Sequence, residues 1–201
     1  LYSNGKGRID LGYVDYFFND FTVDLWVKPM NDGVLLANRQ KEYDKGAKGW
    51  LLFVENGTLK FRYSPSNQFN KPTYEPASDE QKTIEGGKLN MGEWAHVAIT
   101  EKRDGSIRLY VNGMLTGEGE RYRREHTLNN STYLSLFADA FEYAPIEAAV
   151  DELKIWNYEL NEEEIRREMY SVNVDNRNGL VAYYAFNGDN LSTDNGCNIS
   201  W

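Results

Sequence analysis

Paired carboxylates that could act as general acid and base are scarce in this sequence. Asp151 and Glu152 are adjacent, so their side chains point to opposite faces of a strand and cannot act together. Neither His96, in a predicted strand, nor His126, in a predicted loop, belongs to a recognisable nucleophile arrangement. The single cysteine, Cys197, lies in a polar tail. These residues predict no catalytic site.

Recognition of sugars is a second kind of chemistry that the sequence can support. Aromatic rings stack on the C–H faces of sugars, and arginine donates hydrogen bonds to hydroxyl groups or to an acidic sugar. The candidate ligand-binding residues, all in predicted loops, are Tyr43, Phe69, Tyr74, Arg121, Tyr122, Arg123, Phe141 and Tyr143. The alternative is that these rings pack the loops onto the domain, and that the arginines, Arg124 included, are simply solvated.

Composition narrows the possible partners. The 201 residues include 31 acidic and 22 basic side chains, which gives a net charge of −9 at pH 7. This charge makes nucleic acid an unfavourable partner. No apolar run reaches the roughly 18 residues of a membrane helix, so we expect no membrane insertion by this domain. One cysteine excludes an internal disulfide framework.

Alternation of apolar and polar residues with a period of two is the dominant pattern, and it predicts strands. Residues 21–28 alternate clearly, and Pro29 ends that strand because it cannot donate to a ladder. Asn56-Gly57 and Asn112-Gly113 suit two-residue hairpin turns. Further strands are expected at 8–12, 34–38, 49–55, 58–63, 94–101, 106–111, 114–117, 133–138, 149–156 and 180–186. Short strands at this spacing favour an all-β sandwich or barrel.

One short surface helix is expected near residues 162–170. Asn161 can cap its N-terminus, Glu164 completes a capping box, and Leu160 with Ile165 forms a hydrophobic staple. Three stretches lack periodicity and are expected to be irregular rim loops: 64–88, 119–131 and 138–148. We expect one domain over residues 1–188, followed by a polar tail, 189–201, that begins a further segment of a longer protein.

Several segments, in this order, resemble the laminin G-like jelly roll of the concanavalin A-like lectin/glucanase superfamily, in its bacterial and pentraxin-related form. They are RIDLG at 8–12, FTVDLWVKP at 21–29, GEWAHVA at 92–98, IRLYVNG at 107–113, VDELKIWNYELNEEEI at 150–165 and GLVAYYAFN at 179–187. The resemblance implies an all-β jelly roll of two antiparallel sheets, with about twelve to fourteen strands in total.

The resemblance also implies structural calcium. In the family, the aspartate that matches Asp151 often supports Ca²⁺, and Asp10 or Asn4 from the opening segment would be its partner. Leu153 and Ile155 are expected to share the face of Asp151. The alternative is that Asp151 caps a turn or accepts backbone hydrogen bonds without a metal.

Glucanases of this superfamily place three carboxylates on one strand face as E-x-D-x-x-E. The nearest approach here is Glu42-x-Asp44, whose third position is Ala47. The motif is therefore absent, and we do not expect an enzyme.

The function implied is a non-catalytic, extracytoplasmic carbohydrate-binding or recognition module of a larger secreted or cell-surface protein. Its partner would be a glycan or a glycosylated surface, bound through rim loops. The motifs are similar to those of bacterial surface proteins, including outer-membrane lipoproteins of Bacteroidetes. Two alternatives stay open: a protein-binding adhesion or spacer domain without glycan affinity, and a glycoside hydrolase with an unrecognised site.

Overall fold

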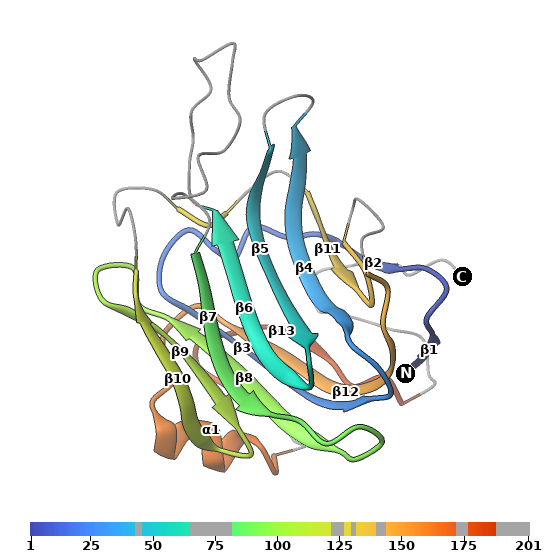
Figure 1. The fold of residues 1–201 in the computed structure, drawn as a ribbon. Helices are drawn as coiled ribbons and strands as arrows, with labels where there is room; N and C mark the ends of the chain where they lie inside the picture. Colours follow the sequence, from blue (N-terminus) through green and yellow to red (C-terminus); the bar gives the residue numbers. More distant parts are fainter. Residues whose placement is uncertain are drawn as a thin grey trace.

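Two antiparallel sheets pack face to face and form a jelly-roll β-sandwich (Figure 1). The structure is a computed structural model that describes residues 1–42, 46–64, 82–121, 127–129, 132–139, 144–171 and 177–187. These residues form thirteen strands and one helix, which confirms the predicted fold class. No helix in the described part of the chain is long and apolar enough to cross a membrane.

The strands divide between a seven-stranded and a six-stranded sheet. The seven-stranded sheet contains, in spatial order, β1 (Tyr2–Asn4), β12 (Glu147–Trp156), β3 (Phe21–Pro29), β8 (Ala95–Glu101), β9 (Ser106–Val111) and β10 (Met114–Glu120), with β13 (Leu180–Tyr184) also paired to β12. The six-stranded sheet contains β2 (Ile9–Tyr13), β11 (Tyr133–Leu136), β4 (Gly33–Glu42), β5 (Gly46–Glu55), β6 (Thr58–Ser64) and β7 (Lys82–Lys88). Asn56 and Asn112 have positive φ in the turns β5–β6 and β9–β10, as the predicted hairpins require.

The apolar core fills the space between the sheets. The inward residues of β3 meet the inward residues of β8, as in the register pairs Val23–Ile99 and Leu25–Val97. The ring of Trp50 lies at the centre of an aromatic group, with its centroid 5.0 Å from that of Phe17. Burying each such side chain stabilises the fold by about 1.5–3 kcal/mol.

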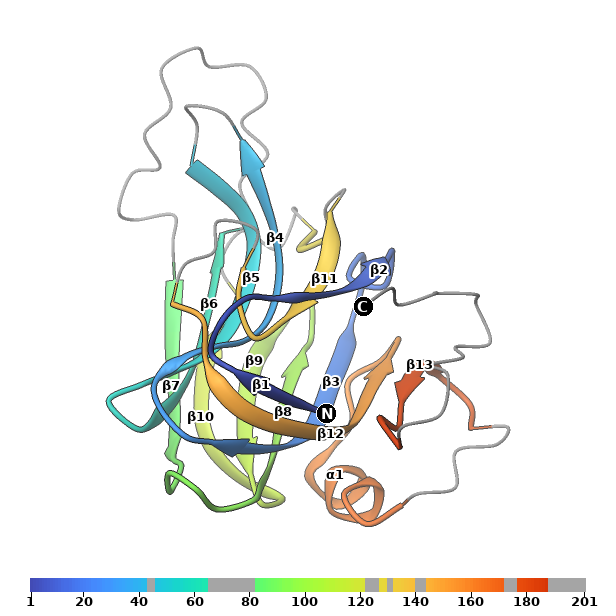
Figure 2. The same cartoon turned by 90° about the vertical axis from the view of Figure 1, so that its right-hand side faces the viewer.

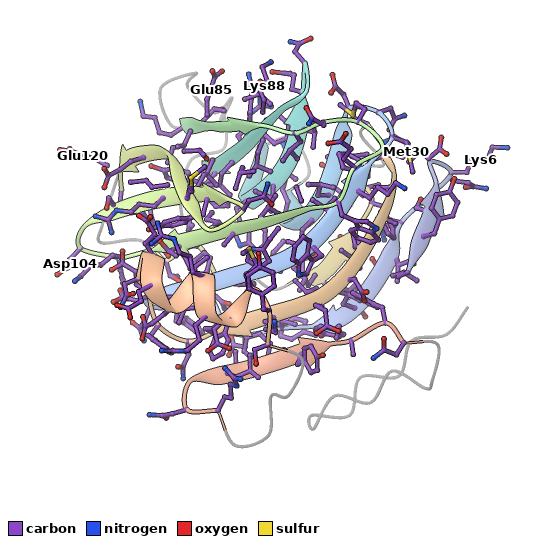
Figure 3. The ribbon with its side chains drawn as sticks, turned by 90° about the horizontal axis from the view of Figure 1, so that it is seen from below. Lys6, Met30, Glu85, Lys88, Asp104 and Glu120 are labelled. Atoms are coloured by element: carbon purple, nitrogen blue, oxygen red, sulfur yellow. The ribbon has the colours of Figure 1, made fainter. Side chains whose placement is uncertain are left out.

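Helix α1 (Glu162–Glu168) covers the outer face of the seven-stranded sheet (Figure 2). The predicted capping box is present, because the Asn161 side chain accepts from the Glu164 backbone while Glu164 accepts from the Asn161 backbone. Leu160 and Ile165 pack with Trp156 in a small apolar cluster beneath the helix. Figure 3 shows the helix lying across this sheet.

Strand β7 corrects the prediction that 64–88 is wholly irregular. Its glycines, Gly86 and Gly87, were interpreted as loop markers but lie within the strand. They face the other sheet at close range, because a Cβ on Gly86 would come within 3.1 Å of Leu109. On β10, a Cβ on Gly117 would overlap the carbonyl oxygen of Glu85. Glycine at these positions allows the edges of the two sheets to approach each other closely, and it does not mark a turn of the chain.

We predict that Gly117→Ala lowers the free energy of unfolding by about 1–3 kcal/mol, because the added methyl group forces β10 away from β7. Urea denaturation followed by circular dichroism measures this change. Gly105→Ala is the matched control, since its methyl group would meet only the flexible Lys102 side chain, at 3.3 Å. Equal stability of the two variants would contradict the close approach of the strands.

Candidate functional site

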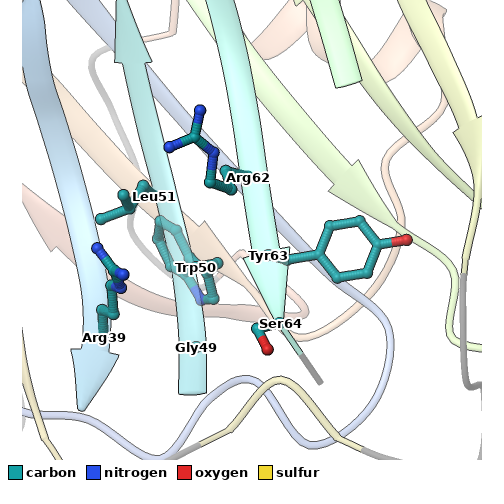
Figure 4. Close-up of a pocket in the computed structure, with 7 residues that line it drawn as sticks. All are labelled: Arg39, Gly49, Trp50, Leu51, Arg62, Tyr63 and Ser64. Carbon is teal, nitrogen blue, oxygen red and sulfur yellow. The ribbon is translucent and has the colours of Figure 1, made fainter. Parts of the chain in front are cut away.

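A small hollow lies on the six-stranded sheet near the ends of β4, β5 and β6 (Figure 4). Its lining residues are Arg39, Gly49, Trp50, Leu51, Arg62, Tyr63 and Ser64. Trp50 and Tyr63 belong to the core, so their strand neighbours Leu51 and Arg62 point to the outer face.

The hollow results from the register of three strands. Arg39 pairs with Gly49, and Gly49 pairs with Ser64, so these three residues form one row across β4, β5 and β6. Gly49 contributes no side chain and leaves a gap between the flanking residues. Its φ of 117° lies in the region that favours glycine, so the gap is built into the backbone.

Arg39 forms one wall of the hollow and is held by a buried carboxylate. Its Nη1 lies 3.0 Å from Oδ2 of Asp139, whose side chain is completely buried. Burial lowers the pKa of Arg39, Asp139 opposes that shift, and the positive charge of Arg62 adds to it. The two guanidinium groups of Arg39 and Arg62 therefore repel each other across the intervening strand β5.

Arg62 forms the other cationic wall. Its Nε donates to Oγ1 of Thr83 at 3.1 Å, and its guanidinium lies 4.9 Å from the ring centroid of Phe53. Within the described part of the chain, its Nη1 and Nη2 have no hydrogen-bond or ion-pair partner. These contacts fix the orientation of the guanidinium and leave its terminal N–H groups for a ligand.

Trp50 contributes no donor to the outer face. Its side chain is 1% exposed and packs in the core, on the face of the sheet opposite to Arg62. Its Nε1–H has no hydrogen-bond partner among the described residues, but the atom is buried, so a ligand beside Arg62 would not reach it.

The hollow therefore combines positive charge with the N–H donors of Arg62, and it has room for about one water-sized group. This combination suits a single hydroxyl or carboxylate oxygen of a ligand that lies over the outer face. No carboxylate is among the described lining residues, whereas glycoside hydrolysis needs two. The arrangement can bind but offers no acid–base pair.

Most of the sequence-predicted ligand residues lie outside the described residues. They are Tyr43, Phe69, Tyr74, Tyr122, Arg123, Phe141 and Tyr143. Two of the segments that carry them begin and end at the strand ends near the hollow, since Glu42 pairs with Gly46 and Tyr63 with Lys82. Their role in binding stays a prediction.

Arg121 differs from its predicted role as a rim-loop ligand residue. It is 2% exposed, its Nε lies 2.5 Å from Oε1 of Glu101, and its guanidinium lies 5.2 Å from the ring centroid of Tyr63. Burial raises the pKa of Glu101 to about 7, and the charge of Arg121 opposes that rise. Arg121 therefore serves the packing of the sandwich, because its charge is committed to a buried partner.

The three residues predicted to hold calcium do not come together. Asn4 pairs with Glu147, four residues before Asp151, which places it about 13 Å away along the strand. Asp10 lies in the other sheet, where its Oδ1 is 2.9 Å from Nε of Arg8. The described residues hold no group of three or more His, Cys, Asp or Glu side chains that could surround an ion.

A β-bulge explains why the Asp151 prediction was wrong about its face. The register passes from Asp151–Trp26 to Lys154–Asp24, so β12 has one extra residue, and Glu152 has a φ of 52°. Leu153 and Ile155 therefore point into the core while Asp151 does not. Oδ1 of Asp151 accepts from the backbone N–H of Glu152 at 3.2 Å, as the metal-free alternative expected.

His96 belongs to a buried polar cluster beneath α1. Its Nε2 lies 3.1 Å from Oδ1 of Asp24, while Nε1 of Trp156 donates to Oδ2 of Asp24 at 2.8 Å. Nζ of Lys154 lies 3.9 Å from the same carboxylate and donates to the carbonyl oxygen of Glu168 at 3.0 Å. His96 and Asp24 are each 1% exposed, so the cluster joins sheet and helix and cannot reach a substrate.

Sequence reasoning missed Arg39 and Arg62. The alternation in 58–63 was sufficient to place Arg62 on a polar face, and Gly49 was a visible break at the start of its strand. Their juxtaposition depends on the pairing of β4 with β5 and of β5 with β6, which a single sequence does not specify.

Comparisons with known proteins agree with this fold. A family model, Laminin_G_3, described as the concanavalin A-like lectin/glucanases superfamily, matches residues 3–166. A candidate carbohydrate binding protein from Bacteroides ovatus has a similar structure, with a TM-score of 0.69 and 15% identity over 98% of this chain and 55% of that one. A comparison with curated proteins found no match.

Two other solved structures share the fold. A heptameric SAP-like pentraxin from Limulus polyphemus has a TM-score of 0.59 and 16% identity, over 96% of this chain and 87% of that one. The botulinum neurotoxin serotype C1 binding domain has a TM-score of 0.57 and 14% identity, over 78% of this chain and 37% of that one. The Bacteroides ovatus protein and the neurotoxin domain are described as binding proteins, and at such identities all three neighbours establish the fold alone.

We predict that Arg121→Met lowers the free energy of unfolding by about 3–5 kcal/mol at pH above 7, because Glu101 loses its partner and must either take up a proton or remain charged in the core. The double variant Glu101→Gln/Arg121→Met removes both charges and should be less destabilised. Urea denaturation of both proteins tests this. Unchanged stability of Arg121→Met would return Arg121 to the list of ligand candidates.

Calcium at Asp151, Asp10 and Asn4 stays a prediction that this geometry does not favour. We expect the wild-type protein to have equal melting temperatures in excess calcium and in excess EDTA. The melting temperature of Asp151→Asn should likewise be the same in the two conditions. Differential scanning calorimetry provides the measurement. A rise in melting temperature with calcium, abolished by Asp151→Asn, would instead support the metal site.

Proposed function

Because this chain belongs to the Laminin_G_3 family of the concanavalin A-like lectin/glucanase superfamily, we propose that it is a non-catalytic carbohydrate-binding module. The observation that carries the proposal is the Arg62 guanidinium at the hollow over Gly49, on the outer face of the six-stranded sheet. Its terminal N–H groups have no partner among the described residues.

The chemistry of the hollow matches a sugar better than an apolar ligand. A sugar ring carries hydroxyl oxygens at its edge, which can accept from the terminal N–H groups of Arg62. These donors are already held in place by the contacts of Arg62 with Thr83 and Phe53, so little side-chain entropy is lost on binding.

Two features support a binding role rather than catalysis. The described lining residues contain no carboxylate, and the sequence lacks the E-x-D-x-x-E arrangement of the superfamily's glucanases. We therefore assign the hollow no chemical step, and the proposed module leaves its glycan intact.

An extracytoplasmic position in a larger cell-surface protein completes the proposal. The chain spans 55% of the Bacteroides ovatus protein and 37% of the neurotoxin binding domain, so similar folds occur within longer chains. Recognition of a glycosylated surface suits such a position.

A second candidate, protein binding, is favoured by one observation. Met30, Met91 and Trp94 are 38%, 41% and 46% exposed, and the backbone N–H of Gly92 bonds the carbonyl of Pro29 at 2.7 Å, which brings their turns together. Figure 3 shows Met30 at the edge of the molecule seen from below. Methionine and aromatic side chains are enriched at protein interfaces.

We predict that the protein binds at least one polysaccharide in a mixed panel of neutral and acidic glycans, measured by affinity electrophoresis. In ¹H–¹⁵N spectra, the bound glycan should shift the Nε–H signal of Arg62, because the guanidinium gains an acceptor on its terminal N–H groups. The signal of Trp94, in the exposed turn beside Pro29, should stay in place and is the internal control.

The outcomes separate the candidates. A shift of Trp94 without a shift of Arg62 would place the glycan elsewhere on the fold. Failure to bind any glycan would remove the carbohydrate proposal and leave protein binding. Release of reducing ends from any polysaccharide would contradict the non-catalytic assignment.

A further inference from the structure

We propose that two copies of this chain associate through the turns at one end of the sandwich, where exposed apolar side chains are bordered by charges of both signs. This turn surface comprises residues 30–32, 56–57 and 88–94 together with Lys28. Figure 3 looks onto this end of the molecule and labels Met30 and Lys88. The association does not depend on the carbohydrate proposal, because the turn surface shares no residue with the lining of the hollow.

The centre of the turn surface is apolar. Met30, Met91 and Trp94 are all exposed, and they lie on turns that meet where Gly92 donates to the carbonyl of Pro29. Large apolar side chains that are exposed together mark an interaction site, whereas single ones are common on any surface. Methionine and aromatic side chains are also the types enriched in the buried centre of protein interfaces.

Hydrogen bonds between the turns hold this surface in one shape. The two carboxylate oxygens of Asp32 accept from the backbone N–H groups of Asn56 and Gly57, at 2.6 Å and 3.0 Å. The Gly57 carbonyl accepts from the backbone N–H of Leu89 at 2.8 Å. The Asn56 carbonyl accepts from Nζ of Lys88 at 2.7 Å. A surface fixed in this way loses little conformational entropy when it is covered.

The charges at the border of the turn surface fit a second copy of the same surface. Lys28 and Lys88 are positive and Asp32 and Glu93 are negative, and none of the four has an ion-pair partner in the described part of the chain. A two-fold interface brings the same patch of each copy together, so the patch must be complementary to itself. A border with both signs meets this condition, whereas a border of one sign would repel its own copy.

The size of the apolar centre sets the strength of the association. Three side chains are a small part of the roughly 20–30 residues that each partner contributes to a standard interface. The net charge of −9 also makes two copies repel each other at long range, so their association needs a specific local surface. We therefore expect a weak and reversible dimer.

Association through the turn surface leaves the hollow over Gly49 free in both copies. Strand β5 carries Gly49 near one end and leads into the turn at Asn56, about 24 Å further along. A dimer thus presents two hollows. If the proposed carbohydrate function holds, one polysaccharide can bind both hollows with a gain in avidity; this consequence rests on that function, and the association itself does not.

Sedimentation velocity of the whole chain tests the association, from about 5 to about 500 µM protein in about 150 mM salt, which screens the long-range repulsion. The sedimentation coefficient should rise with concentration toward that of a dimer. Trp94→Ser and Met91→Ser should each raise the dissociation constant, by about tenfold or more for Trp94, because central aromatic side chains carry much of the energy of an interface. Tyr13→Ser is the matched control, since Tyr13 is also exposed but lies on β2, at the edge of the six-stranded sheet. It should associate like the wild type.

Two results would overturn the inference. The first is a monomer at every concentration, which leaves the turn surface for a partner of another kind. The second is a dimer that persists unchanged in both Trp94→Ser and Met91→Ser, since the copies would then meet elsewhere. Neither result involves a glycan, so failure of the carbohydrate proposal is measured separately.

The stability of the variants is checked by their melting temperatures, which should stay close to that of the wild type because both side chains are exposed. If both variants fail to fold, ¹H–¹⁵N spectra of the wild-type protein decide instead. The indole N–H signal of Trp94 should move as the protein concentration rises and the dimer forms. A Trp94 signal that stays in place while the protein dimerises would overturn the inference.

Discussion

Asp24 occupies the middle of the seven-stranded sheet with both carboxylate oxygens engaged. Trp156 donates to one oxygen at 2.8 Å, and His96 lies 3.1 Å from the other. Lys154 extends the cluster to the carbonyl oxygen of Glu168, at the end of α1. An unpaired carboxylate at this depth would be strongly unfavourable, so the helix and the sheet must stay together for the cluster to exist. Strand β3 is consequently buried on both faces over Phe21–Leu25.

That constraint decides which surface is available for recognition. Helix α1 and its flanking residues occupy the outer face around β3 and β12, and Trp26 is used there as a donor to the carbonyl of Met169 at 3.0 Å. The six-stranded sheet carries no helix on its outer face within the described residues, and its outer row at Arg39, Gly49 and Ser64 contains the hollow. One face of the sandwich is therefore fixed to its own chain, and the other is the face on which we propose that a ligand binds.

Local sequence patterns predicted most of the fold, because strand alternation, hairpin turns and helix caps each depend on residues that are close in the sequence. The alternation in β3, the turn at Asn56-Gly57 and the capping box at Asn161 each depend on a few adjacent residues, and each is present. Strand β7 was missed because its glycines serve an approach between sheets, which involves β9 and β10. The face of Asp151 was mistaken because a bulge shifts the register by one residue. Both errors arose because contacts between strands that are distant in the sequence determine these two features.

The candidate site was harder to predict for a related reason. The segments that resemble the family contain Asp24, Trp26, His96 and Trp156, and these side chains hold α1 on the sheet. Arg39, Gly49 and Arg62 lie outside those segments, on strands β4 to β6. Motifs that identify the fold thus report on its stability, because the buried cluster tolerates little change. Arg39, Gly49 and Arg62 are not part of that cluster, so it places no direct constraint on them. A shared fold does not specify a ligand, and a ligand class has to be argued from individual side chains such as Arg62.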